Sequence, residues 1–345
     1  MNPILGTKPA EHHRTAGATN QPLDQPTPSL AETTEHIIRA LHLSEEMDRL
    51  RKNIAHWIDE ASADIRDELR WQFSGSSKFF RPLTIFCCHR AISSEPIGDA
   101  LMVSAQVLEM FHNVSLIIDD ILDKSTYRRG KKTLHTRFGE LRALMVAGYI
   151  VADGYEMVSR MRGPGVDSRY DIGLLSELLK RLGVAECVQW KLRRQPLGVA
   201  DWENIAREDT GSMFEVCACL GARSDRLRRF GRYLGMLYHG CDDVGDVKGL
   251  TALGGGGTED LRDGILTLPA ALAIRDPAVR KLFCKEEPSE ADLERLAAAF
   301  HAQIDEAERH LDGIAERARA EASANSAAAE GLLALVDHTR QLSKR

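Results

Sequence analysis

The segment that most restricts how this chain can fold is residues 111–130, which read FHNVSLIIDDILDKSTYRRG. A mostly apolar run ends there in three aspartates, and two arginines follow. Carboxylates that are buried together repel one another and lose hydration, unless positive charge lies between them. A fold that buries the apolar run must therefore bring its acidic end to a place that a cation can reach.

Helical geometry gathers these polar side chains on one face. Each residue of a helix turns by about 100°, so Asp119 and Asp123 share a face, Asp120 flanks them and His112 lies on the same stripe. The opposite stripe is predicted to be apolar and comprises Val114, Leu116, Ile117 and Ile121. One side of this predicted helix thus carries a histidine and three carboxylates.

A second segment repeats the arrangement. Residues 238–246 read YHGCDDVGD, in which three aspartates share a side with His239; they are Asp242, Asp243 and Asp246. A single motif of this kind is usually a solvated helix end, but two of them favour a binding site. Carboxylates from two facing helices make an oxygen-rich cleft, which suits Mg²⁺ and leaves coordination positions open for phosphate.

The rest of the chain reads as one helical domain. Residues 1–30 are rich in Pro, Thr and small polar residues without periodicity, which predicts a disordered segment. Over residues 31–345, apolar residues recur at three- and four-residue spacings, and alternating strand-like runs are absent. Short breaks fall at 74–78, 162–168, 254–257 and 285–290, and Ser289 with Asp292 predicts a capping box. The predicted fold class is therefore all-α, a helical bundle with a central active-site cavity.

Composition excludes several classes of partner. The chain has 345 residues, 43% of them hydrophobic and 28% charged, and its formal net charge is −6. No basic excess indicates nucleic acid or an anionic membrane. The seven cysteines include no CxxC pair, which favours reduced thiols. No apolar run of membrane-spanning length and no signal-like N-terminus is expected, so the prediction is a cytoplasmic protein without an integral membrane segment.

Four segments together resemble the trans-isoprenyl diphosphate synthases, among them the geranylgeranyl diphosphate synthases. SSKFFRPL (76–83) is similar to the GGKRxRP element of that family, and LEMFHNVSLIIDDILDKSTYRRGKKTLHTRFG (108–139) resembles its first aspartate-rich region. GMLYHGCDDVGD (235–246) resembles the second, and EDLRDGILTLP (259–269) the segment that follows it. The resemblance covers about residues 70 to 275.

The resemblance implies a reaction of ionisation, condensation and elimination. An allylic diphosphate loses pyrophosphate, isopentenyl diphosphate attacks the resulting cation, and a proton is removed, with the released pyrophosphate as its acceptor. It also implies Mg²⁺, three ions per site, and a homodimer, with a heteromer as a further possibility. The implied ligands bind metal either directly, through Asp119, Asp123 and Asp242, or through water, through Asp120, Asp243 and Asp246.

The same resemblance implies roles for the remaining site residues. Isopentenyl diphosphate would be held by four cationic or polar residues, Lys78, Arg81, His112 and Arg129. Arg128 would contact the allylic diphosphate, and Thr210 would steady the carbocation. In the family a bulky aromatic four or five residues before the first aspartate closes the floor of the pocket. Here Ser115 and Val114 stand at those positions, with Phe111 one turn deeper, which favours geranylgeranyl diphosphate as the product.

Several positions depart from the family pattern. Asp209 and Ile265 stand where the family has lysines, and His239 stands where it has glutamine. Ser76-Ser77-Lys78-Phe79 replaces GGKR, while Glu186 and Gln189 resemble the variant of long-chain members. The allylic side of the site therefore lacks two cations. Four basic residues are candidates to replace them: Lys191, Arg193, Arg194 and Lys248.

Two other functions stay open on the sequence. A class I terpene synthase would ionise and cyclise an allylic diphosphate without isopentenyl diphosphate, and retention of Lys78, Arg81 and His112 argues against it. A weakly active regulatory subunit of a heteromeric prenyl synthase is favoured by Asp209 and Ile265, but all six motif aspartates are retained.

Overall fold

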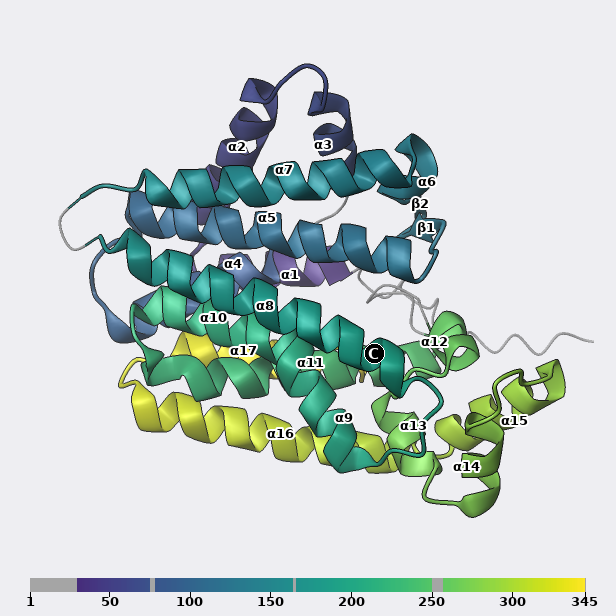
Figure 1. The fold of residues 1–345 in the computed structure, drawn as a ribbon. Helices are drawn as coiled ribbons and strands as arrows, with labels where there is room; N and C mark the ends of the chain where they lie inside the picture. The colour runs from purple at the N-terminus through teal and green to yellow at the C-terminus, as the bar shows by residue number, and fades with distance from the viewer. Residues whose placement is uncertain (1–29, 75–77, 164–165, 250–256, 345) are drawn as a thin grey trace, which may run out of the picture.

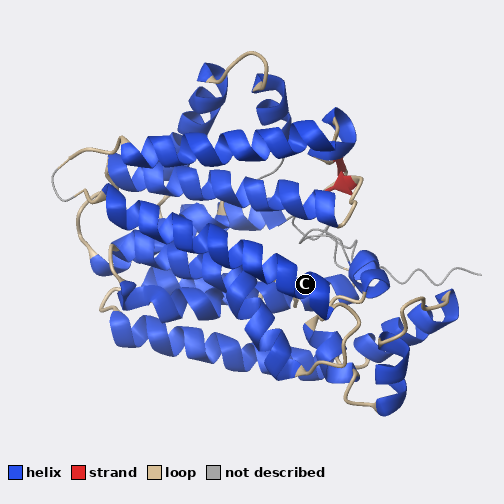
Figure 2. Ribbon diagram, in the orientation of Figure 1, coloured by secondary structure: helices blue, strands red, loops and turns tan. Residues whose placement is uncertain are grey.

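The computed structural model describes residues 30–74, 78–163, 166–249 and 257–344. The segment predicted to be disordered lies outside these residues except at Leu30, and so do most of the break at 74–78 and residues 254–256 of the GGGG run. Helices make up most of the described chain and strands almost none of it (Figure 2), which confirms the all-α prediction.

The helices and strands follow one another in a fixed order. The first half comprises α1 (Leu30–Ala40), α2 (Ser44–Glu60), α3 (Arg66–Phe73), α4 (Phe80–Ile92), α5 (Asp99–Leu122), β1 (Tyr127–Arg128), β2 (Lys131–Lys132), α6 (Leu134–Phe138), α7 (Glu140–Ser159) and α8 (Ser168–Leu192). The second half comprises α9 (Val199–Ala206), η1 (Arg207–Gly211), α10 (Ser212–Ala222), η2 (Asp225–Leu227), α11 (Arg228–Val247), α12 (Gly257–Asp263), α13 (Leu268–Ala273), α14 (Pro277–Phe283), α15 (Glu290–His301), α16 (Ile304–Asn325) and α17 (Glu330–Arg340).

The long helices pack side by side around α10 (Figure 1). Every residue of α10 is buried, and it packs on α4, α8 and α11, while α5 packs on α7 and α11 on α16. A helix that is apolar on nearly all sides must be covered on all sides. Two cysteines of α10, Cys217 and Cys219, are buried in this core with Cys87 and Cys88 of α4.

Helix α5 corrects one expectation. By length and composition it could cross a membrane, whereas the sequence pattern predicted no run of that length. Within the fold, however, 72% of its most apolar window is buried. Its apolar character is therefore accounted for by packing against α4, α7 and α10.

A small hairpin follows α5 and was not predicted. β1 and β2 pair antiparallel, with Tyr127 opposite Lys132 and Arg128 opposite Lys131. The turn between them is Arg129-Gly130, and both residues have positive φ (52° and 74°), as a two-residue hairpin turn of type I′ requires. Strands of two residues leave no alternating pattern to read. The predicted capping box of α15 is confirmed, since Ser289 and Asp292 bond each other's backbone N–H.

Candidate active site

Two adjoining cavities lie between α4, α5, α8 and α11. The smaller one, of about 160 Å³, is lined by Lys78, Arg81, Arg128, Arg129 and Lys131 among others, and we call it the cationic cavity. The larger one, of about 420 Å³, is lined at one end by carboxylates, and we call it the acidic cavity. They share six lining residues: Arg81, His112, Leu116, Arg128, Arg129 and Tyr238.

The cationic cavity unites the four residues predicted to hold isopentenyl diphosphate. Lys78, Arg81, His112 and Arg129 all line it. Arg81 Nη1 lies 3.0 Å from His112 Nε2. Burial, and then the charge of Arg81, lowers the pKa of His112 well below its ordinary value, so the neutral ring accepts this hydrogen bond. Burial and the charge of Arg129 lower the pKa of Lys78 to about 7.

The hairpin turn brings its two arginines to the boundary between the cavities. Arg128 Nε donates to Asp120 Oδ1 at 2.7 Å, and Asp120 is buried. Burial raises the pKa of Asp120 even though Arg128 opposes the shift. Asp120 therefore fixes the hairpin to the end of α5, which places Arg128 and Arg129 in both cavities.

The acidic cavity holds two carboxylates that each keep one oxygen without a hydrogen-bond partner among the described residues. Asp119 Oδ1 and Asp242 Oδ1 are buried and accept no hydrogen bond from the described residues. Burial, and next the charges of Glu186 and Asp209, raise the pKa of Asp119 well above its ordinary value. Burial likewise raises the pKa of Asp242. Asp119 also lies in the last turn of α5, where the helix dipole disfavours negative charge.

Asp123 is the one aspartate of the first motif with a basic partner from a distant helix. Arg193 Nη2 donates to Asp123 Oδ1 at 2.9 Å, and Arg193 Nη1 donates to Asp263 Oδ2 at 3.0 Å. Arg193 thus joins the end of α5 to α12. Of the four basic residues predicted as replacements for the missing lysines, it is the one whose described contacts reach the acidic motifs.

The other three candidates lie elsewhere. Lys248 bonds Glu308 and the carbonyl of Ser343, both at 2.6 Å. Arg194 donates to the carbonyls of Arg262 and Phe283, and the side chain of Lys191 is exposed. Their predicted compensating role finds no support in these contacts.

In the second motif, Asp243 is engaged by the protein itself. Its Oδ2 accepts from Trp202 Nε1 at 2.7 Å and from the backbone N–H of Leu268 at 2.8 Å. Asp243 therefore ties α11 to α9 and to the first turn of α13. Asp242 and Asp246, by contrast, both raise the pKa of a further carboxylate, Asp260.

Sequence reasoning missed one carboxylate of this site, Asp260, and named another, Glu186, without giving it a role. Asp260 on α12 has its pKa raised well above the ordinary value by burial and then by Asp243, Asp246 and Asp242. Glu186 on α8 lines the acidic cavity, and burial together with Asp209 raises its pKa to about 7. Glu186 continues the stripe of Leu179 and Leu182 that faces the cavity, and this spacing could have revealed its place there.

A short π-helical turn, η1, supplies the residues at which the chain departs most from its family pattern. Asp209 has non-helical φ and ψ (−81°, −105°), and its Oδ2 lies 3.3 Å from His239 Nδ1. Thr210 Oγ1 lies 3.1 Å from the same nitrogen. Burial alone would lower the pKa of His239, but Asp243 and Asp209 raise it to about 9. Burial would raise the pKa of Asp209, but His239 brings it below its ordinary value.

These shifts mean that the histidine is a cation placed against the aspartate. The two unusual residues thus neutralise each other, and no positive charge is left over to take the place of the family's lysine. Ile265, where the second lysine would stand, is half-buried and lines neither cavity. Gln189 also lines neither cavity.

The residues predicted to set product length line the apolar end of the acidic cavity. Phe111, Val114 and Ser115 all contribute to its wall. Phe111 is fully buried and meets Tyr155 edge-on, with ring centroids 5.4 Å apart. A Cβ added to Gly154 of α7 would lie 2.6 Å from Phe111 Cε1, so α7 supports this ring by close approach.

One detail of the helical-wheel interpretation is wrong. Leu116 and Val114 were assigned to the stripe opposite the motif, but both line the acidic cavity, and Leu116 also lines the cationic one. Leu116 lies one helical turn after His112, so it shares the face of that histidine.

The donor set of the acidic cavity fits a divalent cation. Mg²⁺ prefers oxygen ligands, above all deprotonated carboxylates. Here two buried carboxylate oxygens have no hydrogen-bond partner among the described residues, and the pKa values of both groups are raised. Asp119 and Asp242, which lie on α5 and α11, line this cavity. Among the described residues, no three histidine, cysteine or acidic side chains converge closely enough to enclose a metal on their own.

Comparison with known proteins adds independent information. A family model described as polyprenyl synthetase matches residues 63–300. The chain is 27% identical over 258 residues to octaprenyl diphosphate synthase of Haemophilus influenzae, which covers 72% of this chain and 76% of that protein. It is 28% identical over 231 residues to geranylgeranyl pyrophosphate synthase 4 of Arabidopsis thaliana, which covers 61% of this chain and 60% of that one.

Solved structures share the fold. The crystal structure of polyprenyl synthase from Caulobacter crescentus CB15, complexed with calcium and isoprenyl diphosphate, superposes with a TM-score of 0.77. The match covers 93% of this chain and 100% of that one at 22% identity. At that identity the likeness establishes the helical fold alone.

Proposed function

The chain belongs to the polyprenyl synthetase family and is a prenyltransferase, and from this premise we propose that it condenses isopentenyl diphosphate with an allylic diphosphate to a linear trans product. The observation that carries the proposal is the pairing of the two cavities. A cationic cavity suits the diphosphate of isopentenyl diphosphate, which stays in the product. An acidic cavity with an apolar end suits the metal-bound diphosphate of the allylic substrate and its hydrocarbon tail.

We assign the isopentenyl diphosphate to the cationic cavity. Lys78, Arg81 and Arg129 would bind its phosphate oxygens, and the neutral ring of His112 would hold Arg81 in place. Burial in this cavity strengthens each charge-assisted contact by excluding water. The isopentenyl double bond would then lie where the two cavities meet, close to Leu116 and Tyr238.

We assign the allylic substrate to the acidic cavity. Asp119, Asp123 and Asp242 would hold Mg²⁺, with Asp120, Asp243 and Asp246 in orienting or water-mediated roles, and three ions per site remain a prediction. Bound Mg²⁺ would neutralise the diphosphate and stabilise it as a leaving group. Arg128, at the boundary, would contact the same diphosphate. Thr210 would present its hydroxyl to the forming allylic cation, and the apolar wall would exclude water from that cation.

Product length is proposed from the same wall. Because Val114 and Ser115 are small, the floor falls to Phe111, one turn deeper along α5. We propose geranylgeranyl diphosphate as the main product. The named relatives make products of several lengths, octaprenyl and geranylgeranyl among them, so this specificity depends on the wall of this chain.

A homodimer is proposed from an apolar face. Helix α7 exposes Leu141 (72%) and Met145 (61%), and α8, which contacts α7, exposes Val184 (63%). Exposed apolar patches of this kind mark interaction surfaces. Light scattering of the purified chain and of a Leu141→Glu/Met145→Glu variant tests this proposal: a dimer that becomes a monomer in the variant supports it, and a wild-type monomer contradicts it. A cytoplasmic location stays a prediction.

The deciding experiment is a product assay of the purified chain with Mg²⁺. Isopentenyl diphosphate is supplied with dimethylallyl, geranyl, farnesyl or geranylgeranyl diphosphate in turn, and each allylic substrate is also supplied alone. Linear diphosphates that form only with isopentenyl diphosphate support the proposal. Hydrocarbon or alcohol from an allylic substrate alone would indicate a terpene synthase, and no turnover with any substrate would favour a regulatory subunit.

A further inference from the structure

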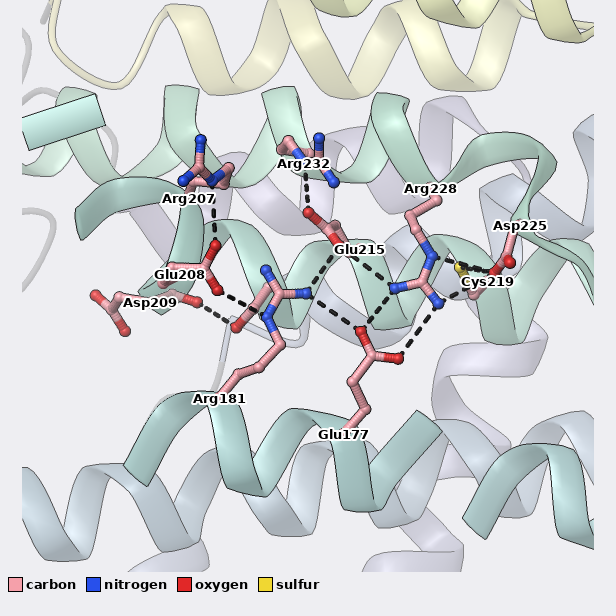
Figure 3. A network of polar contacts seen from close by, with 11 residues as sticks. Glu177, Arg181, Arg207, Glu208, Asp209, Glu215, Cys219, Asp225, Arg228 and Arg232 are labelled. Carbon is pink, nitrogen blue, oxygen red and sulfur yellow. Dashed lines mark hydrogen bonds and ion pairs between the residues drawn. The ribbon is translucent and has the colours of Figure 1, made fainter. Parts of the chain in front are cut away.

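A network of ion pairs joins η1 to the helices around it (Figure 3). It links α8, η1, α10 and α11 through Glu177, Arg181, Glu208, Glu215, Arg228 and Arg232, which line neither cavity. Its centre is the buried carboxylate of Glu215, which accepts from Arg181 at 2.9 Å and from Arg232 at 2.5 Å. The function proposed above uses none of these residues.

Of these six residues, Glu208 is the one that belongs to η1. Arg181 Nε donates to Glu208 Oε2 at 2.9 Å, and Arg207 Nε donates to Oε1 at 3.1 Å. The next residue, Asp209, extends its side chain into the acidic cavity toward His239. Adjacent residues of the turn are therefore held from opposite sides, Glu208 by α8 and Asp209 by α11.

The backbone of η1 is fixed against α11 as well. Thr210 presses its carbonyl against Gly235, where an added Cβ would lie 2.6 Å from that oxygen. Ser212 Oγ donates to the carbonyl of Asp209 at 2.7 Å. A π-helical turn places one extra residue in the helix, and such turns often occur at functional sites. Here the turn directs Asp209 and Thr210 into the cavity while Glu208 points out of it.

We propose that Glu208 is a positioning residue for the allylic half of the reaction. Its ion pair with Arg181 fixes the register of η1, so that Asp209 and Thr210 meet His239 at the acidic end of the cavity. The inference rests on the proposed function for its kinetic meaning, but the structural statement about η1 can be tested without turnover. Because the Glu208 side chain is 43% exposed, the pair adds little to overall stability.

The chain supplies a matched control in Glu177. This carboxylate belongs to the same network, bonds the same Arg181 at 3.3 Å and Arg228 at 2.8 Å, and is 36% exposed. It lies on α8 and has no described contact with η1. Glu208→Ala and Glu177→Ala thus each remove one exposed acid from Arg181, but only the first releases the turn.

The test combines kinetics with amide hydrogen exchange. In Glu208→Ala we expect faster exchange over residues 207–211 and a fall of about tenfold in kcat/KM for the allylic diphosphate, since small misplacements of positioned groups can cost up to about 10²-fold. The KM for isopentenyl diphosphate should stay within about twofold of the wild-type value, because the residues of η1 do not line the cationic cavity that we assign to that substrate. Glu208→Gln, which keeps a hydrogen-bond acceptor for Arg181, should recover part of the loss. Glu177→Ala should leave both the exchange of η1 and the allylic kcat/KM unchanged.

Two results overturn the inference. One is an equal effect of Glu208→Ala and Glu177→Ala on exchange or on allylic kcat/KM, which would reduce Glu208 to a general stabilising role. The other is unchanged exchange over η1 in Glu208→Ala, which would show that the turn is held without the ion pair. A wild-type chain without turnover would contradict the proposed function, and the exchange comparison would still decide whether Glu208 fixes η1.

Discussion

The cationic and acidic cavities adjoin, but burial shifts the pKa values of their titratable groups in opposite directions. In the cationic cavity, burial and neighbouring cations lower the pKa of Lys78 to about 7. In the acidic cavity, burial and neighbouring carboxylates raise the pKa of Glu186 to about 7. Away from Arg81, Arg128 and Arg129, which line both cavities, like charges thus gather on each side, and this disfavours the folded chain in the absence of ligand. The difference indicates that each cavity is completed by its ligand, an anion on one side and a divalent cation on the other.

The largest expected effect comes from removing a charge on the acidic side. Asp119→Asn should lower kcat by about 10²–10³-fold, the size of effect seen when one electrostatic stabiliser of a transition state is lost. The same change should raise the melting temperature without metal. A buried carboxyl with a raised pKa weakens the fold as pH rises above its unfolded pKa, and Asn cannot ionise. Kinetics with Mg²⁺ measure the change in kcat, and thermal unfolding with EDTA measures the change in melting temperature. A fully active variant would show that Asp119 is not a metal ligand.

The matching change on the cationic side should alter binding of the other substrate. Arg81→Met removes a guanidinium that bonds His112 at 3.0 Å, and we expect the KM for isopentenyl diphosphate to rise by about 30-fold or more, since truncating a buried charge pair costs about 2–5 kcal/mol. The allylic KM should change much less. Arg137→Met is a suitable control, because Arg137 stacks 3.6 Å above the ring of Trp71 and lines neither cavity. Equal effects on both substrates would contradict the assignment of one substrate to each cavity.

A smaller effect is expected from separating the ion pair of Asp209 and His239. His239→Gln leaves Asp209 as a partly buried carboxylate without its cation, so it should destabilise the fold by about 1–3 kcal/mol and lower allylic kcat/KM. In the double variant, Asp209→Asn also removes the unpaired negative charge, so most of the lost folding stability and most of the lost allylic kcat/KM should be restored. Such non-additivity is expected of residues in direct contact. Additive losses in unfolding free energy would show that the two residues act independently.

The smallest effect concerns pH. Because Lys78 has a pKa of about 7, it loses its proton in the free enzyme as pH rises through neutrality. The KM for isopentenyl diphosphate should therefore rise severalfold between about pH 7 and pH 8.5, since only the protonated amine attracts the diphosphate. The free energy of unfolding should rise over the same pH range, since deprotonation of Lys78 removes the penalty of a buried charge from the folded chain. In Lys78→Arg the charge persists, so a KM that varies equally with pH in both proteins would assign the dependence to another group.

Local periodicity predicted the fold class and the two aspartate faces, and resemblance to a family predicted the residues of the cationic cavity. The two aspartate motifs lie on α5 and α11, and Lys78, Arg81, His112 and Arg129 meet in one cavity. The hairpin that carries Arg129 was not predicted, because two-residue strands leave no pattern. Asp260 and the ion pair of Arg193 with Asp123 depend on how α12 and the end of α8 pack against α5, and no spacing along the chain encodes that packing.

The replacements at 209 and 239 show the same limit from another direction. Each looks like an isolated loss when the chain is compared with its family position by position. In space they are partners, because the π-helical turn brings Asp209 within 3.3 Å of His239, 30 residues further along the chain. The sequence shows two departures, whereas the structure shows one compensated change.

The contact between Phe111 and Gly154 has an evolutionary consequence. An added Cβ at Gly154 would meet the Phe111 ring at 2.6 Å, so the space that a side chain at 111 can occupy depends on what stands at 154. The depth of the acidic cavity thus depends on two positions, 111 on α5 and 154 on α7. A lineage that reduced residue 111 would gain room for a larger residue 154, and that second change would then block the return of phenylalanine. Drift between product lengths along such a path would be easier to begin than to reverse.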